Sequence, residues 1–140
     1  MTLRSLLAGA ALLAFATPVL SAPARAAAPL VLSGSTDLPG YTGDFDHFAI
    51  DEKDKTLFLA GEESAELEAM DVATGKVKTR LKGFGVPHSI HYMAAANELL
   101  VIDGGKPSPV LDAATLKIKR SYALPKGADS SGFDAATGEL

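Results

Sequence analysis

Residues 70–76 read MDVATGK, and residues 111–117 read LDAATLK. A second similarity has its own register: Leu57 opens the run LFLA, Leu99 opens the run LLVI, and Leu140 follows at the same place in a third unit. Self-similarity at a fixed period is the sequence signature of repeat architectures. The two registers agree and therefore predict a repeat of about forty residues.

Each unit has the pattern of four short strands, because short apolar runs alternate with Gly, Asp, Asn and Ser turns. In the first unit the strands are expected at residues 46–51, 56–61, 67–72 and 76–82. The second is apolar on both faces, which is typical of a strand inside a sheet, and the fourth alternates with Lys and Arg, which is typical of an outermost strand. The pattern predicts an all-β fold, a β-propeller of four-stranded antiparallel blades.

Three strings carry a resemblance to a known family: FDHFAID at residues 45–51, MDVATGKV at residues 70–77 and VPHSI at residues 86–90. They resemble the YVTN-repeat (YncE-like) proteins, which are exported seven-bladed propellers of bacteria and archaea. The resemblance covers nearly everything after residue 30, although LFLA and LVID stand where the motif that names the family would be. It is informative mainly about the fold, since the blade motif encodes turns and packing.

Residues 1–26 have the order of a secretory signal peptide: Arg4, an apolar run over residues 6–20, then small residues. The run is too short for a comfortable membrane span. Cleavage is expected after Ala26, with Ala24 as second choice, and the alternative is a buried N-terminal helix or a retained anchor. The mature protein is then periplasmic or secreted, with no membrane span.

The repeat register divides the remaining chain. Residues 27–44 are expected to hold a linker and an outer strand, at residues 30–38, of the kind that completes the last blade of a closed propeller. Blades follow at residues 45–85 and 86–127, and a partial blade at 128–140. We interpret the chain as an N-terminal fragment with about two and a half blades. Repeat arrays need at least about three units and capped ends, so in isolation it should be marginally stable or aggregation-prone.

Composition limits the partners. Signal cleavage would leave eleven basic and seventeen acidic side chains, a formal charge of −6 against −4 for the whole chain. The basic residues are scattered singly, so nucleic acid is not an expected partner. The sequence has no cysteine, hence no disulfide and no lipid attachment site. A small ligand or another exported protein is the expected partner.

Candidate binding residues lie where the innermost strands begin, because these strands line the central channel of a propeller. They are Asp46 and His47 in the first blade, His88 and, further along, His91 in the second, and Asp129 in the third. Converging imidazole and carboxylate groups could bind a divalent metal, with His47, His88 and Asp129 as candidate ligands, or hydrogen-bond a polar ligand. Alternatively, each histidine bonds a backbone carbonyl or the next blade, and Asp46 fixes a turn.

Two loops should lie at the same mouth, DGGKP at residues 103–107 and its counterpart GEESA at residues 61–65. Glycines let backbone amides approach a ligand, and Lys106 could pair with an anion. The alternative is a hairpin turn that needs positive φ angles. Ser130 and Ser131 beside Asp129 give no support for a catalytic triad, and neither a phosphate-loop pattern nor a nucleophile elbow is present in the sequence.

Two functions follow. The first is a non-catalytic periplasmic propeller that binds or scaffolds a ligand or protein, and the lack of a catalytic motif favours it. The alternative, similar to the first at the level of the blade, is a metal-dependent lactonase-type hydrolase or the propeller subunit of a periplasmic redox enzyme. A lactonase would need carboxylate and amide ligands from several blades around one calcium-like ion.

Overall fold

The computed structural model describes residues 30–134 and 136–140, and the predicted signal peptide at residues 1–26 lies outside them. The chain divides into two units, Met1–Leu32 and Ser33–Leu140. All strands of the described residues belong to the second unit. In the described part of the chain, no helix has the length and apolar character needed to cross a membrane.

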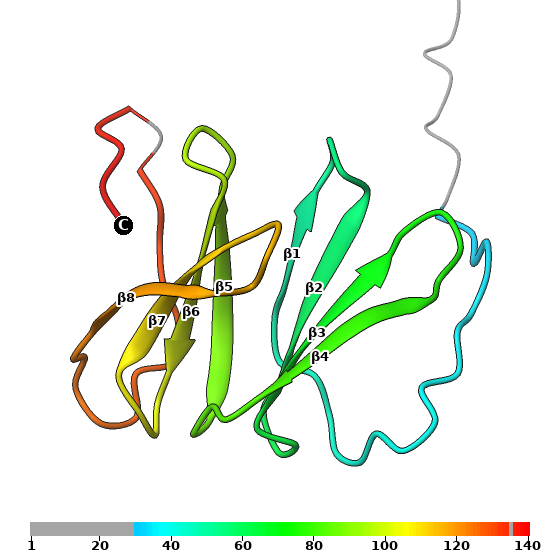
Figure 1. Cartoon of the computed structure of the whole chain (residues 1–140), viewed down its shortest axis with the longest axis horizontal. Helices are drawn as coiled ribbons and strands as arrows, with labels where there is room; N and C mark the ends of the chain where they lie inside the picture. Colours follow the sequence, from blue (N-terminus) through cyan, green and yellow to red (C-terminus); the bar gives the residue numbers. More distant parts are fainter. Residues whose placement is uncertain (1–29, 135) are drawn as a thin grey trace, which may run out of the picture. The chain divides into compact units, whose positions relative to one another are not determined.

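Eight antiparallel strands form two four-stranded sheets, in which the spatial order follows the chain order (Figure 1). The first sheet contains β1 (Phe48–Asp51), β2 (Thr56–Gly61), β3 (Glu66–Asp71) and β4 (Val77–Lys82). The second contains β5 (Pro87–Met93), β6 (Glu98–Asp103), β7 (Ser108–Asp112) and β8 (Ile118–Tyr122). The all-β prediction is confirmed, and the predicted strands of the first unit lie within two residues of the observed ones. The described residues do not close into a ring of sheets.

The string that reveals the repeat is a turn between the third and fourth strands. Asp71 Oδ1 accepts hydrogen bonds from Thr74 N at 2.8 Å and from Thr74 Oγ1 at 2.9 Å. Asp112 accepts the same two bonds from Thr115, both at 2.9 Å. The side-chain and backbone hydrogen bonds of Thr74 hold the pKa of Asp71 below its usual value. In each turn the residue after the threonine has a positive φ, 68° and 56°. Both turns thus depend on side-chain capping of the backbone.

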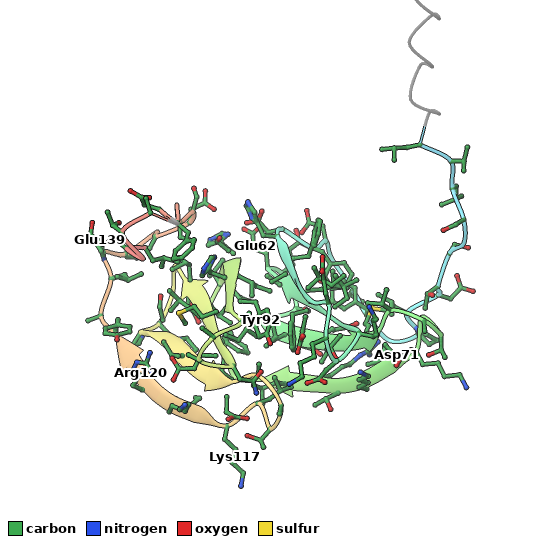
Figure 2. The ribbon with its side chains drawn as sticks, turned by 90° about the horizontal axis from the view of Figure 1, so that it is seen from above. Glu62, Asp71, Tyr92, Lys117, Arg120 and Glu139 are labelled. Atoms are coloured by element: carbon green, nitrogen blue, oxygen red, sulfur yellow. The ribbon has the colours of Figure 1, made fainter. Side chains whose placement is uncertain are left out.

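The two sheets bury an apolar core between them, which we call the inter-sheet core. Its fully or largely buried members are Phe58, Ala60, Leu67, Ala69, Phe84, Ile90, Leu99, Val101, Leu111 and Ala113. Tyr92 packs against this core and lies between the sheets in Figure 2. Phe58 and Tyr92 have their ring centroids 6.4 Å apart. This core joins the two repeats through packing alone.

A second, smaller cluster lies on the opposite face of the second sheet and contains Leu100, Ile102 and Val110. Leu100 occupies the position of Phe58 one repeat earlier, and Val110 that of Ala69. Each repeat therefore has one face that packs against the following repeat and one that receives the preceding repeat.

Strand burial agrees with the predicted order. β6 is buried at all six residues, whereas β8 is exposed at all five. β4 forms the other outer edge and carries Lys78, Arg80 and Lys82. Charged side chains on an edge strand discourage pairing with other chains.

The two ends of the described unit differ from complete repeats. Residues 30–38 contain no strand in the structure, and the outer strand predicted there stays a prediction. At the other end, Asp134 N donates to Glu139 O and Gly138 N donates to Asp134 O, both at 2.8 Å. The turn between the first and second strands of the third unit thus begins at Asp134, where the repeat register predicts it.

Candidate functional site

The first strand of each sheet, β1 and β5, begins with an irregular pair that can redirect a side chain. Before β1, Asp46 N donates to Ala60 O and Ala60 N donates to His47 O, both at 2.9 Å. Two consecutive residues therefore share one partner, the arrangement of a β-bulge. Bulges are common beside functional sites, where they redirect a side chain.

The second repeat has the same irregularity. The register of β5 and β6 shifts between Pro87 and Ile90, and His88 lies within this shift. By the repeat register, His88 is equivalent to Asp46 in the first repeat and to Asp129 in the third. A shared position in successive repeats brings the three side chains toward one place.

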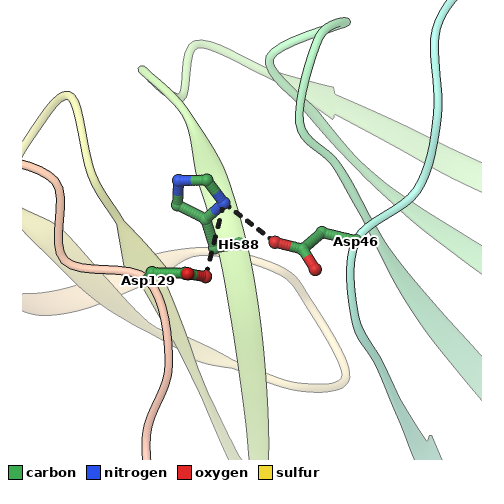
Figure 3. Close-up of side chains that lie close together, drawn as sticks. All are labelled: Asp46, His88 and Asp129. Carbon is green, nitrogen blue, oxygen red and sulfur yellow. Dashed lines mark hydrogen bonds and ion pairs between the residues drawn. The ribbon is translucent and has the colours of Figure 1, made fainter.

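Figure 3 shows that the three side chains converge from three separate segments, one before β1, one on β5 and one after β8. His88 Nδ1 lies 2.8 Å from Asp46 Oδ2 and 3.7 Å from Asp129 Oδ1. One ligand atom from each residue lies within 4.8 Å of the others. The three residues thus form a compact group of two carboxylates around one imidazole nitrogen.

Two further side chains extend the group. Glu62, on the loop between β2 and β3, places Oε1 3.9 Å from His88 Nδ1. His47 Nδ1 lies 2.7 Å from Asp46 Oδ1, so Asp46 contacts one histidine with each carboxylate oxygen. Sequence reasoning did not select Glu62, although it had placed the GEESA loop at this end of the strands. We call Asp46, Glu62, His88 and Asp129 the carboxylate-imidazole cluster.

The cluster is accessible and carries excess negative charge. The His88 side chain is 14% exposed, whereas Glu62 and Asp129 are 39% and 62% exposed. Among residues 30–134 and 136–140, no lysine or arginine forms an ion pair with the three carboxylates of the cluster. Two like charges about 4 Å apart repel by about 1 kcal/mol in bulk water and about 4 kcal/mol near a protein surface. A cation bound between the carboxylates would offset that repulsion.

The other edge of His88 faces a shallow groove of about 410 Å³, which also involves Val86, Gly104, Lys126 and Gly127. A Cβ atom at Gly104 would lie 3.2 Å from His88 Nε2 and 3.0 Å from the Ala128 carbonyl oxygen. Glycine at position 104 therefore leaves room for the imidazole ring. One ring edge of His88 faces the carboxylates and the other faces the groove.

Two of the predicted site residues lie elsewhere. The His91 ring packs against Phe133, with ring centroids 4.5 Å apart. Lys106 Nζ donates to Gly83 O at 2.7 Å, in the connection between the two sheets. The structure brings Asp46, His47, His88 and Asp129 together, but not His91 or Lys106.

The loop at residues 103–107 is organised by the buried side chain of Asp103. Its carboxylate accepts hydrogen bonds from the backbone N–H groups of Gly85, Val86, Gly105 and Lys106, at 2.7 to 2.9 Å. Burial raises the pKa of Asp103, but these four donors outweigh that effect and hold it below the usual value. A Cβ at Gly85 would lie 2.8 Å from backbone atoms of Gly105, so the two segments touch only because both are glycine. No residue of this loop has a positive φ, so the positive-φ turn expected here is not formed; in the counterpart loop at residues 61–65, Ala65 has a φ of 55°.

Comparison with known proteins does not assign the cluster: no protein-family model and no curated protein matches the sequence. The function has to be argued from the cluster and from the repeat that builds it.

Proposed function

We propose that the chain belongs to a β-propeller of the YVTN-repeat type and that the protein is an exported, non-catalytic binding protein. Its ligand binds where the innermost strands begin, at the carboxylate-imidazole cluster. The stacking of the two sheets supports the propeller, because opposite faces of successive repeats meet and the same packing can continue with further repeats. The resemblance of the FDHFAID and MDVATGKV strings to that family supports the same proposal.

One observation carries the binding role. Asp46, His88 and Asp129 hold the same position in three successive repeats, and their polar atoms lie within 4.8 Å of one another. Packing does not require polar groups at this position, since it lies outside the inter-sheet core. Converging polar groups on a concave surface are the usual feature of a ligand site. A small cationic or polar ligand, or a basic side chain of another exported protein, fits the negative charge.

The test is a screen of small polar and cationic compounds by thermal shift, followed by hydrogen–deuterium exchange with each hit. Protection at residues 46–47, 61–66, 86–89 and 127–131 is the expected result. Protection confined to the turns at the opposite end of the strands, residues 51–55 and 93–97, would contradict the proposal. His88→Asn should abolish the thermal shift, and His91→Gln should leave it unchanged.

Export is tested separately. The protein expressed with its complete N-terminus in a Gram-negative bacterium should be recovered from the periplasm with Ala27 as its first residue. Recovery from the cytoplasm with residues 1–26 intact would contradict export.

A metal-dependent hydrolase is the second candidate, and the closeness of two carboxylates to His88 favours it, because such groups can hold a metal that activates water. Hydrolysis of simple lactones, measured with added divalent metal, decides between the two candidates. Turnover that needs the metal and is lost in the His88→Asn variant would support the hydrolase and contradict the non-catalytic binding protein. Undetectable turnover leaves the binding protein, whereas metal-independent turnover would contradict both candidates.

A further inference from the structure

We propose that the carboxylate-imidazole cluster is a binding site for one divalent transition-metal ion of the zinc type. Asp46, His88 and Asp129 are its ligands, and the Glu62 carboxylate lies beside them, with Oε1 3.9 Å from His88 Nδ1. This inference rests on the proposed function, since it names the ligand of the same site. It goes further by stating the chemistry of that ligand and the role of each side chain.

The donor atoms of Asp46, His88 and Asp129, which lie within 4.8 Å of one another, are spaced close to the donors of a four-coordinate ion. Metal bonds of about 2.0–2.2 Å from imidazole and carboxylate place neighbouring donors of a tetrahedral site about 3.4 Å apart. Asp129 Oδ1 and Glu62 Oε1 lie 3.7 and 3.9 Å from His88 Nδ1, close to that value. Asp46 Oδ2 lies 2.8 Å away, at hydrogen-bond distance, so a small rotation of its carboxylate opens the remaining position.

His47 has a separate role, as a positioning residue. Its Nδ1 lies 2.7 Å from the Asp46 oxygen that does not face His88. A partner of this kind orients a metal-binding carboxylate, and loss of such a partner typically lowers metal affinity by about 10- to 100-fold. His47 thus holds Asp46 toward the site without being a ligand itself.

The donor types select the class of ion. Calcium is bound by about six to eight oxygen atoms, and magnesium keeps most of its water ligands. An imidazole nitrogen at the centre of the group favours a zinc-like ion instead. The three carboxylates, which have no lysine or arginine partner among the described residues, provide the negative charge that a divalent ion neutralises. Asp46, His88 and Asp129 stand at the same position of three successive repeats, which is why their side chains meet.

The test is a zinc titration of the purified, chelator-treated protein in competition with a chromophoric chelator. One equivalent of Zn²⁺ should bind, and Co²⁺ should give the visible absorption of a four-coordinate site that has one nitrogen ligand. His88→Asn, Asp46→Asn and Asp129→Asn should each weaken binding by more than about 100-fold, and His47→Gln by about tenfold. Circular dichroism checks that each variant keeps its β structure.

Two matched controls use the same chemistry outside the cluster. His91→Gln and Glu63→Gln should bind zinc like the unmodified protein, whereas Glu62→Gln, on an exposed loop where folding is not at risk, should bind it more weakly. Binding that survives His88→Asn, or that is lost in His91→Gln, would overturn the metal site. Absence of zinc binding together with compound-induced protection at residues 86–89 and 127–131 would also overturn it, while leaving the proposed function intact. Absence of both would overturn the two proposals together.

Discussion

The two sheets share one backbone plan but bury different charged groups. In the first sheet, the Glu68 side chain is fully buried although it lies on the face of the sheet that is turned away from the second sheet. The equivalent residue of the second sheet is Pro109. Arg80 Nε lies 2.7 Å from Glu68 Oε1, yet neither carboxylate oxygen accepts an aligned hydrogen bond from the described residues. Burial, the largest influence, raises the pKa of Glu68. The folded structure therefore makes ionisation of Glu68 less favourable than it is in water.

The second sheet shows the opposite case. Glu98, which replaces Thr56 of the first repeat, accepts hydrogen bonds from Arg120 at 2.8 and 2.6 Å, and Lys119 lies 2.8 Å from it. The hydrogen bonds from Arg120, and to a smaller extent that from Lys119, lower the pKa of Glu98 to about 2. The difference teaches that the turns are kept from one repeat to the next, while a single position on a sheet face can change: Pro109 stands for Glu68, and Glu98 for Thr56.

The largest expected effect concerns the outer faces of the pair. Phe48 is 68% and Ile50 43% exposed on the first sheet. In isolation, the 140-residue chain should be less stable than the usual range of about 5–15 kcal/mol and should self-associate through these faces. Sedimentation velocity at increasing concentration, with thermal unfolding of the same samples, measures both. A monomer that unfolds cooperatively would contradict the prediction.

A matched pair of leucines sharpens the comparison. Leu99 is fully buried between the sheets, and Leu57, at the equivalent position of the first repeat, is only partly buried on the outer face. Leu99→Ala should lower the free energy of unfolding by about 3 kcal/mol and Leu57→Ala by about 1 kcal/mol, because only the first leaves a closed cavity. Urea unfolding of both variants checks the ratio. Equal losses would mean that the outer face is as well packed as the core.

Asp103 tests a feature that only the second sheet has. Gly61 occupies the equivalent position of the first sheet and has no carboxylate to organise its loop. Asp103→Ala should cost about 2–3 kcal/mol, because four backbone N–H groups lose a charged acceptor. Urea unfolding measures the loss, and Asp44→Ala, at an exposed position, is the control. A loss no larger than that of the control would show that water replaces the carboxylate.

The smallest expected effects concern the pH dependence of stability, which should have opposite sign for Glu98 and Glu68. Glu98 has a pKa of about 2 in the folded protein, so its contribution to stability is present above pH 4.5 and is lost as the pH falls toward 2. Glu98→Gln should therefore lower the melting temperature at pH 7, and the deficit should shrink below pH 4.5.

For Glu68 the sign is reversed, because its pKa is raised in the folded protein. Its favourable contribution is complete below pH 4.5 and is lost as the pH rises through the folded pKa. Glu68→Gln should match or exceed the unmodified protein at pH 7 and lose that advantage in acid. The measurement is the melting temperature of both variants and of the unmodified protein from pH 3 to pH 7. If the difference from the unmodified protein changes with pH in the same direction for both variants, the opposite pKa directions of Glu98 and Glu68 are contradicted.

Local features of the sequence predict much of the fold. The turn at Asp71 uses hydrogen bonds within a few residues, so its position can be read from the sequence, and its recurrence at Asp112 sets the register. The same register selects Asp46, His88 and Asp129 as candidates, because a repeat places equivalent positions side by side.

Contacts between distant segments could not be predicted in the same way. The approach of Glu62 to His88 depends on how the two sheets pack, and the bond from Lys106 to Gly83 depends on the path of the connection. The burial of Glu68 also escapes sequence patterns, because a charged residue on an alternating strand is normally expected in water. These features belong to the tertiary structure.

The bulge at the start of β1 and of β5 has a consequence for how such repeats diversify. It sets the site position apart from the in-and-out alternation of the strand, so Asp46 and His88 contribute nothing to the apolar core. A duplicated repeat can exchange this one side chain without repacking its neighbours. Selectivity for a new ligand can therefore be acquired one repeat at a time, and the same position offers a place for engineering it.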